Sequence, residues 1–274
     1  MKKKLSIKKL IFLIIFIISF IMLIISIINI IKWKKDNDLT SNIIQEIDNI
    51  VEVDTVKDND NTEIIEQPEE IKKDNPYWDY IKMDLINVDF KELKNINNDS
   101  IGWIKVNGTN INYPFVQTTD NSYYLTHAFN KKYSDAGWVF ADYRNNMDVF
   151  DKNTILYAHA RLDKTMFGSL KNILKNGWLN DTNNYVVKLS TEKENTLWQV
   201  FSIYHIPTTN DYIRVEFKDN DDFMNFASML LDRSIHNFNT TISQNDKILT
   251  LSTCYSNNQK LVLHAKLIKK ETRS

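Results

Sequence analysis

A continuous apolar run near the N-terminus is the strongest pattern in the chain. Residues 10–31 are apolar except for Ser19, Ser26 and Asn29. As a helix at about 1.5 Å per residue the run spans roughly 33 Å, which is enough to cross the hydrocarbon core of a bilayer. No site of small residues follows it, so the run predicts an uncleaved anchor and not a signal peptide. A buried core helix is the alternative, but such a helix rarely lacks a polar face over this length.

Lysines flank this run on both sides and indicate its orientation. Five of them precede it within residues 1–9, and three follow it within residues 32–35. The excess on the N-terminal side predicts that residues 1–9 form a cytoplasmic basic segment and that residues 10–31 span the cell membrane once. The remaining residues, including any catalytic domain, are then extracellular.

A polar and acidic segment, residues 32–76, separates the predicted anchor from the aromatic-rich part of the chain. Apolar residues at helical spacing predict one amphipathic helix near residues 40–52. These residues are Ile43, Ile44, Ile47, Ile50 and Val51. Residues 54–74, which include Pro68, have the composition of a solvated linker. The whole segment is interpreted as an extracellular linker that holds a domain of residues 77–274 away from the membrane.

Beyond the linker the pattern changes to short runs of β-forming residues separated by turns. Asn107 and Gly108 open the gap between the first two runs and are typical of a hairpin. The runs lie at residues 101–106, 111–115, 137–140, 154–157, 185–189, 197–204, 248–253 and 261–268. Helical spacing is found at 90–96, near 164–174 and near 221–236. Many short strands with few long helices favour a mainly β fold of the α+β type, a closed or nearly closed barrel, over a doubly wound sheet.

Composition supports a packed domain and excludes some functions. Hydrophobic residues make up 43% of the 274 residues and aromatic residues 12%, which is enough for a core. The net charge of −1 gives no reason to expect nucleic acid as a partner. The five glycines form no GxxxxGK or GxGxxG phosphate-binding motif. The single cysteine, Cys254, cannot form an intramolecular disulfide, although the predicted location is oxidising.

Two residues at predicted strand ends have the chemistry of a cysteine enzyme. Cys254 ends the run 248–253 and is followed by the polar turn 255–258. His159 follows the run 154–157, so both side chains are expected at the rim of a rigid barrel. A thiol needs a base or a cation nearby to form a thiolate, and histidine commonly supplies it. Cys254 is thus a candidate nucleophile and His159 its acid/base partner, with an inert buried cysteine as the alternative.

The other four histidines are weaker candidates. His264 alternates within the last run and is expected to face solvent or a neighbouring residue. His236 ends a predicted helix, where a cation suits the helix dipole. His205 and His127 are placed in connections. A structural role is expected for each of them.

Several motifs carry a resemblance to a known family. TLSTC at residues 250–254 resembles the cysteine signature of sortases, and TILYAH at residues 154–159 resembles their histidine motif. MFGSL at residues 166–170 resembles the class B form of the next helix. Further segments similar to class B sortases, in the family's order, are GWI at 102–104, INYP at 111–114, NSYYL at 121–125, DYRN at 142–145 and the predicted helix at 221–236. The resemblance covers roughly residues 77–270.

The resemblance implies a closed, sortase-type eight-stranded β-barrel with N-terminal helices and a long helix before the last two strands. It also implies a cysteine transpeptidase, or sortase-type endopeptidase, that attaches secreted proteins to the cell wall or to each other. Cys254 would attack the carbonyl of a sorting-signal peptide and form a thioacyl-enzyme. His159 would protonate the leaving amine and later deprotonate the incoming amine.

The same resemblance implies the partners. One is a secreted protein with a C-terminal sorting signal, and the other is an amine acceptor from peptidoglycan or from a pilin. No cofactor and no metal are expected. Six residues are expected to line the peptide groove, namely Asn121, Leu125, Thr208, Tyr212, Ile213 and Ser252. For Leu125, Tyr212 and Ile213 a place in the core is an equal alternative.

Two positions depart from the family's pattern. Lys260 stands at the start of the last run, where sortases place an arginine that stabilises the developing oxyanion. Lysine keeps the charge but lacks the planar fork, so slower chemistry is expected if Lys260 has this role. Arg161 is the alternative donor, although a solvated rim charge is its plainer interpretation. Ala158 replaces the glycine that is usual in the histidine motif.

Two other functions therefore stay open. A catalytically silent extracellular binding module on the same fold would lack a reactive thiol, whereas an active Cys254 should alkylate quickly near neutral pH. An unrelated cysteine hydrolase would release its peptide to water and would need no amine acceptor.

Overall fold

The computed structural model describes residues 6–65 and 75–273 of the chain. Residues 1–5 of the predicted basic segment and residues 66–74 of the predicted linker lie outside this part. The chain forms two compact units, Met1–Asn42 and Ile43–Ser274.

The first unit is formed by helix α1 (Ile7–Ile50), which continues into the second unit. Apolar side chains are exposed throughout the predicted anchor, for example those of Phe16 and Ile31. Within the described ranges, α1 is the one helix that is long and apolar enough to cross a membrane. Because such a surface is stable in lipid and costly in water, it supports membrane anchoring. The amphipathic helix expected near residues 40–52 is the C-terminal part of α1, and its Ile43 and Ile47 are buried.

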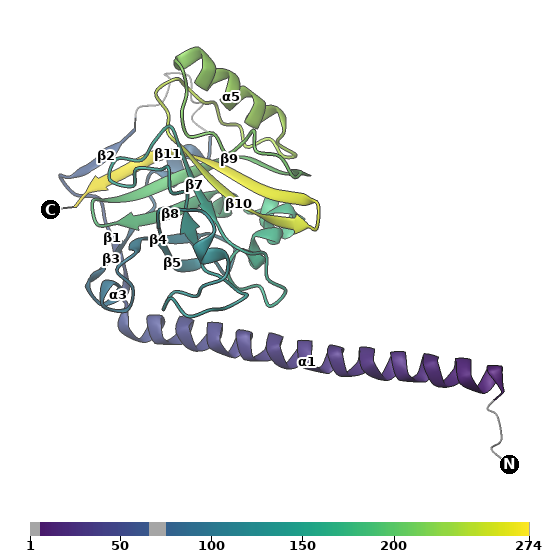
Figure 1. The fold of residues 1–274 in the computed structure, drawn as a ribbon. Coiled ribbons are helices and arrows are strands. Elements are labelled where there is room, and N and C mark those ends of the chain that lie inside the picture. Colours follow the sequence, from purple (N-terminus) through teal and green to yellow (C-terminus); the bar gives the residue numbers. More distant parts are fainter. Residues whose placement is uncertain (1–5, 66–74, 274) are drawn as a thin grey trace. The chain divides into compact units, whose positions relative to one another are not determined.

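The second unit is built on a closed barrel of eight strands (Figure 1). The strands in order around the barrel are β10 (Ile248–Ser256), β7 (Asn153–Tyr157), β6 (Phe140–Ala141), β5 (Asn112–Val116), β4 (Ser100–Val106), β8 (Val186–Thr191), β9 (Glu194–Pro207) and β11 (Gln259–Thr272). The β10–β11 hairpin closes the ring, and β10 runs parallel to β7. The predicted eight-stranded barrel is therefore confirmed.

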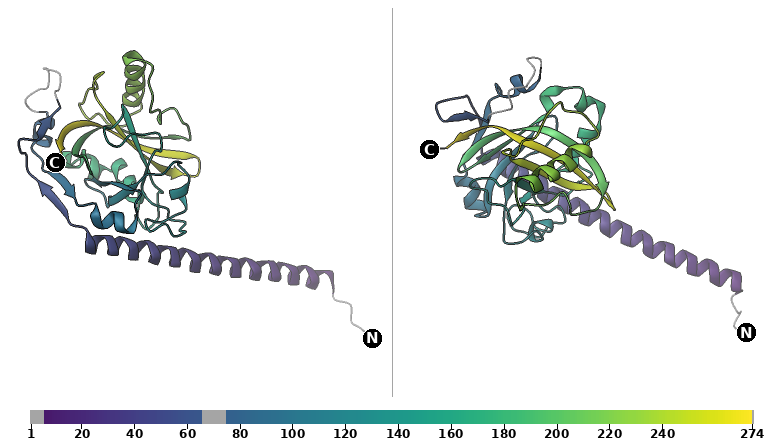
Figure 2. Two further views of the ribbon diagram at one scale, coloured as in Figure 1. Left: turned by 60° about the vertical axis from the view of Figure 1, so that its left-hand side comes forward. Right: turned by 90° about the horizontal axis from the view of Figure 1, so that it is seen from above.

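Helix α5 (Asn220–Asp232) packs against the outside of this barrel (Figures 1 and 2). Its Phe223, Phe226 and Leu230 form one buried cluster with Phe201 and Tyr204 of β9. Burial on both faces explains why β9 has an almost continuous apolar run and not an alternating pattern.

The helix predicted near residues 221–236 ends before His236 in the structure. Its last residue is Asp232. Just beyond it, the Ser234 hydroxyl accepts a hydrogen bond of 3.2 Å from the Ile203 amide of β9. This bond to the barrel turns the chain away from the helix axis.

The described part of the chain also contains short helices. They are α2 (Tyr77–Tyr80), α3 (Lys91–Ile96), η1 (Tyr123–Leu125), η2 (Gly168–Leu174), α4 (Asn176–Leu179) and η3 (Thr182–Asn184). The predicted helix at 164–174 begins only at Gly168, as the 3₁₀ helix η2, because Lys164 and Met166 have positive φ angles of 66° and 50°. The predicted strand at 137–140 is reduced to β6 because Gly137, at a φ of 58°, is in a turn conformation.

The interpretation of residues 54–74 as a solvated linker is wrong for its first part. Strand β1 (Val53–Val56) pairs with β3 (Leu85–Val88), and β2 (Thr62–Ile64) pairs with the outer edge of β11. Between these strands, Asp58 accepts a hydrogen bond of 2.6 Å from the fully buried Lys269. A buried ammonium requires such partners. These pairings join residues far apart in the chain, so local composition did not reveal them.

Candidate active site

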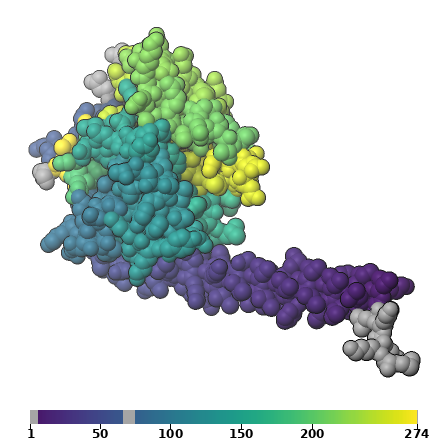
Figure 3. Space-filling model, viewed as in Figure 1, coloured from purple at the N-terminus to yellow at the C-terminus, as the bar shows by residue number. Residues whose placement is uncertain are grey.

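The strands β7 and β10 bring the two predicted reacting residues to the same end of the barrel. They run parallel, with Ser252 opposite Tyr157. One residue further along, the Thr253 hydroxyl donates to the Ala158 carbonyl oxygen at 2.7 Å. Cys254 and His159 are the next residues on these two adjoining chains, which are about 5 Å apart in parallel sheets. Cys254 is exposed and lies close to the turn of the β10–β11 hairpin. Part of the C-terminal strands reaches the surface in yellow in Figure 3.

His159 is oriented by a loop from another part of the chain. Its Nε2 lies 2.8 Å from the carbonyl oxygen of Leu125, at the end of η1. A carbonyl oxygen only accepts, so Nε2 carries a proton and donates it. In the neutral ring Nδ1 then has the free lone pair, which is the atom that can accept a proton. Leu125 therefore contributes to the site through its backbone, while its side chain is exposed.

Lys260 is the cation that contacts the sulfur. In the β10–β11 hairpin it lies directly opposite Cys254, and its Nζ donates to Sγ at 3.4 Å. A positive charge at this distance stabilises a thiolate, and it also lies close to any carbonyl that the sulfur attacks. Arg161 instead pairs with Asp163, at 3.3 Å between its Nη2 and Oδ2.

Two of the predicted groove residues meet directly beside the cysteine. The Tyr212 hydroxyl and the Ser252 hydroxyl lie 2.9 Å apart, and both residues are buried. Burial raises the pKa of Tyr212, the bond with Ser252 lowers it, and the nearby Cys254 raises it further. Tyr212 therefore stays protonated and can donate a hydrogen bond. Ile213 is partly buried and packs against the cluster formed with α5.

The remaining predicted groove residues, Asn121 and Thr208, lie on loops and are linked to the site through other residues. Asn121 accepts a hydrogen bond of 3.0 Å from the Tyr143 amide. The Thr208 amide donates to the Asn258 carbonyl, at 3.0 Å, in the turn of the β10–β11 hairpin. The structure thus joins Tyr212 to Ser252 directly, whereas Asn121 and Thr208 show no direct bond to the other groove residues among the described contacts.

Asp142 and Arg144, which were predicted only as part of the DYRN motif, join several parts of the site. The Arg144 guanidinium binds both oxygens of the fully buried Asp142, at 2.8 and 2.7 Å, and also the Ile213 carbonyl oxygen at 3.0 Å. Asp142 accepts a further bond from the Tyr157 hydroxyl at 2.9 Å. Burial raises the pKa of Asp142, but the bonds from Arg144 and Tyr157 outweigh it and lower the pKa below its usual value. The DYRN motif was the signal that could have identified this ion pair.

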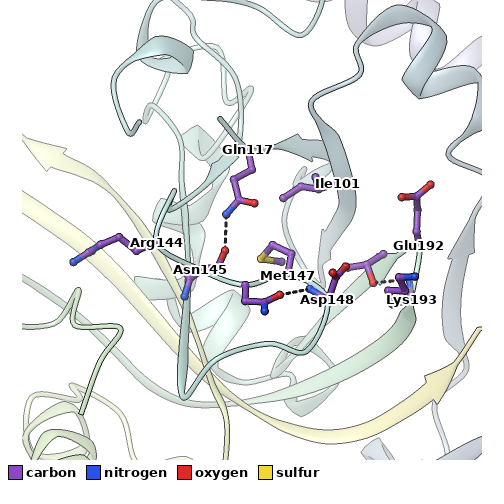
Figure 4. Close-up of a pocket in the computed structure, with 10 residues that line it drawn as sticks. Ile101, Gln117, Arg144, Asn145, Met147, Asp148, Glu192 and Lys193 are labelled. Atoms are coloured by element: carbon purple, nitrogen blue, oxygen red, sulfur yellow. Dashed lines mark hydrogen bonds between the residues drawn. The ribbon is translucent and has the colours of Figure 1, made fainter. Parts of the chain in front are cut away.

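A cavity of about 420 Å³ opens on another part of the barrel (Figure 4). The Gln117 amide closes one side of it by donating to the Asn145 carbonyl oxygen at 2.8 Å. Arg144 and Lys193 are among its lining residues, but none of the three predicted catalytic residues is. The cavity is therefore separate from the cysteine.

His264 is fully buried on the face of the barrel that α5 covers, between two hydroxyl groups. Its Nε2 lies 2.8 Å from the Tyr204 hydroxyl and its Nδ1 lies 2.9 Å from the Thr250 hydroxyl. Thr250 donates its one proton to Asn153 Oδ1 at 2.6 Å. Nδ1 of His264 must therefore donate to Thr250, and Nε2 accepts from Tyr204. Of the two expectations for His264, contact with a neighbouring residue is confirmed and exposure to solvent is wrong, because this polar chain satisfies the ring in the core.

We expect His264→Gln to flatten the pH dependence of stability on the acid side. Burial, with a smaller effect of nearby Arg233, lowers the pKa of His264 from 6.5 to about 3. Protonation then favours the unfolded state, so stability is complete above the unfolded pKa and falls as the pH drops toward the folded one. Over this range the wild type should lose about 1.4 kcal/mol more per pH unit than the variant. Urea titrations of the full chain in detergent check this, and equal pH slopes would contradict it.

The geometry defines the general class of protein. A cysteine that contacts a cation and adjoins a histidine, at the rim of a closed barrel, is suited to cysteine-dependent acyl transfer. Residues 104–268 match the sortase domain family. The chain is 34% identical over 188 residues to Sortase B of Listeria monocytogenes, and this match covers 66% of this chain and 75% of that protein.

Solved structures agree with this match. A Staphylococcus aureus sortase B–substrate complex is 35% identical, with a TM-score of 0.61, and the similarity covers 66% of this chain and 84% of that one. Sortase B from Bacillus anthracis in complex with AAEK1 is 30% identical, with a TM-score of 0.66 over 87% of this chain and 99% of that one. The chain therefore belongs to the sortase family of cysteine transpeptidases, and within it to the class B sortases.

Proposed function

We propose that this sortase cleaves a sorting-signal peptide through a thioacyl intermediate on Cys254. The Cys254 thiol gives its proton to Nδ1 of His159, and the resulting thiolate attacks the scissile carbonyl. A sulfur–carbon bond forms, and the carbon–nitrogen bond breaks as Nδ1 gives this proton to the leaving amine. An amine acceptor then loses a proton to His159 and displaces the sulfur, which restores the thiolate. The observation that carries this proposal is the position of Cys254 between two partners. Lys260 Nζ lies 3.4 Å from its Sγ on one side, and the end of strand β7, which His159 follows, adjoins it on the other.

Lys260 would stabilise the oxyanion that develops during both steps. Its Nζ contacts the sulfur, and the carbonyl oxygen of a bound peptide comes to lie within a bond length or two of that sulfur. The groove for the peptide would be formed by Asn121, Leu125, Thr208, Tyr212, Ile213 and Ser252. Ser252 and Tyr212 support this assignment because their hydroxyl pair lies directly beside the cysteine strand end.

The related structures support the proposed substrate and acceptor classes. One similar solved protein is a sortase B–substrate complex, and another is sortase B complexed with triglycine. By analogy, this chain would take a secreted protein with a C-terminal sorting signal and join it to an amine of the cell wall or of a pilin. Helix α1 would anchor the enzyme with residues 1–9 in the cytoplasm, residues 10–31 in the membrane and residues 77–274 outside as the catalytic domain.

A peptide screen tests this function. The full chain, in detergent micelles, is incubated with a library of internally quenched hexapeptides, first alone and then with triglycine. We expect a mass increase on Cys254 that equals the N-terminal part of one peptide, and its transfer to triglycine when the acceptor is added. A stable chain that forms no adduct would favour a silent binding module, and release to water with no effect of triglycine would favour a hydrolase.

A further inference from the structure

The loop between β9 and α5 is held by side chains at four successive residues, Asp211 to Arg214. Arg233 binds the Asp211 carboxylate at 2.9 and 2.6 Å. Buried Asn153 donates from Nδ2 to the carbonyl oxygens of Tyr212 and Arg214, at 3.4 and 2.7 Å. We call residues 211–214 the anchored segment.

The carbonyl group of Ile213, which lies between Tyr212 and Arg214, is bound by the Asp142–Arg144 ion pair. Arg144 Nη2 donates to the Ile213 carbonyl oxygen at 3.0 Å. Three successive carbonyl groups, from Tyr212 to Arg214, are therefore occupied by side chains of the barrel and of the loop that precedes β7. Backbone groups that are satisfied in this way resist rearrangement, because moving them breaks several bonds at once.

Asn153 is itself fixed by a buried side chain of the neighbouring strand β10. It is fully buried, and its Oδ1 accepts the Thr250 hydroxyl at 2.6 Å. Thr250 in turn accepts from His264, which accepts from Tyr204. Every hydrogen-bonding atom of the Asn153 amide is used, and its two N–H groups both face the anchored segment. The buried polar chain therefore ends in a donor pair aimed at the loop.

The anchored segment positions the residues that the proposed function assigns to the groove. It carries Tyr212, whose hydroxyl meets Ser252, two residues before Cys254. It also carries Ile213, which packs on the α5 cluster. If the segment loosens, the energy of ordering it must be supplied by the bound peptide, and this weakens binding more than it slows chemistry.

We propose that Asn153 is a positioning residue for the peptide substrate. It acts through the carbonyl groups of Tyr212 and Arg214, and it sets the affinity for the peptide and not the reactivity of the thiol. This inference rests on the proposed function, because the groove role of Tyr212 does.

Asn153→Asp tests the inference with a change of one atom. The substitution replaces the donating nitrogen with oxygen and keeps the acceptor for Thr250. We expect KM for the peptide found in the screen to rise about tenfold or more, because two carbonyl groups lose their donor. The value of kcat should change less than about threefold, and the rate of Cys254 alkylation by iodoacetamide less than about twofold. Amide hydrogen exchange in residues 208–214 should be faster than in the wild type.

Asn195→Asp is the matched control. Asn195 is a buried amide in β9 at the end of the strand away from Pro207, and its Nδ2 binds the Glu271 carboxylate at 2.8 Å. None of its described hydrogen bonds reaches the anchored segment, so its variant should lose stability without a rise in KM. If Asn153→Asp does not fold, Thr250→Val, which has nearly the same shape, removes the bond that orients Asn153 and should raise KM about threefold.

The outcomes separate the inference from the proposed function. An unchanged KM with unchanged exchange in Asn153→Asp, or the same rise in KM for Asn195→Asp, would overturn the role of Asn153. A parallel loss of alkylation rate would also overturn it, because the residue would then act on the thiol. Failure of the wild-type chain to form any peptide adduct would instead overturn the proposed function, while faster exchange in residues 208–214 would still report the anchoring.

Discussion

Cys254→Ala is expected to abolish both the peptide adduct and the transfer to triglycine. The proposed reaction requires a sulfur–carbon bond, and Cys254 is the single cysteine of the chain. His159→Ala should form adduct slowly, with kcat lowered about 10³-fold, the loss expected when a positioned acid/base is removed. Mass spectrometry of the adduct and the initial rates of transfer provide both measurements.

A second histidine gives a matched control for His159. The Nε2 atom of His236 is hydrogen-bonded to the Tyr185 hydroxyl at 3.0 Å, and the residue lies beyond the end of α5. His236→Ala should keep kcat near that of the wild type. Retained activity in Cys254→Ala would exclude the thioacyl route, and retained activity in His159→Ala would show that another group transfers the proton.

Lys260→Ala should lower kcat about 100-fold, whereas Lys260→Arg should keep or raise it. Removal of one donor from an oxyanion site costs roughly this factor, and arginine restores the charge with a planar fork of donors. The alkylation rate of Cys254 separates the two effects of the lysine. If alkylation slows as much as turnover, Lys260 acts mainly on the thiolate, and if only turnover slows, it acts on the oxyanion.

Arg161 provides the comparison for this prediction. Arg161 forms an ion pair with Asp163, whereas Lys260 contacts the sulfur of Cys254. Arg161→Met should therefore reduce kcat much less than Lys260→Ala. The opposite order, with a silent Lys260→Ala, would assign the oxyanion to Arg161 or to another donor.

The barrel could be predicted from the sequence because each strand is a short local run bounded by turns. Cys254 and His159 could also be predicted from the sequence, because both directly follow such a run and the family motifs include them. The position of Lys260 opposite Cys254 follows in the same way, because a short turn between two strands fixes their register.

The features that were missed depend on partners distant in sequence. The sequence of strand β2 has the composition of a linker, and only its pairing with β11 makes it a strand. Asp58 likewise has the sequence context of a solvated residue, but it accepts a hydrogen bond from the buried Lys269. His264 has a place in the core only because Tyr204 and Thr250, on β9 and β10, supply its bonds. The hydrogen bonds to the carbonyl groups of the anchored segment could not be predicted from local composition, because they involve backbone atoms of residues 212–214.

The position of β10 in the ring decides when the enzyme becomes competent during folding. Its neighbour β11 is only a short turn away, whereas β7 lies about a hundred residues upstream, so the pairing of β7 with β10 requires a much longer loop to close. A chain that has formed only the β10–β11 hairpin would bring Cys254 and Lys260 together, but His159 would not yet be beside them. A chain in which the β7–β10 pairing has not yet formed is therefore expected to be inert toward peptides.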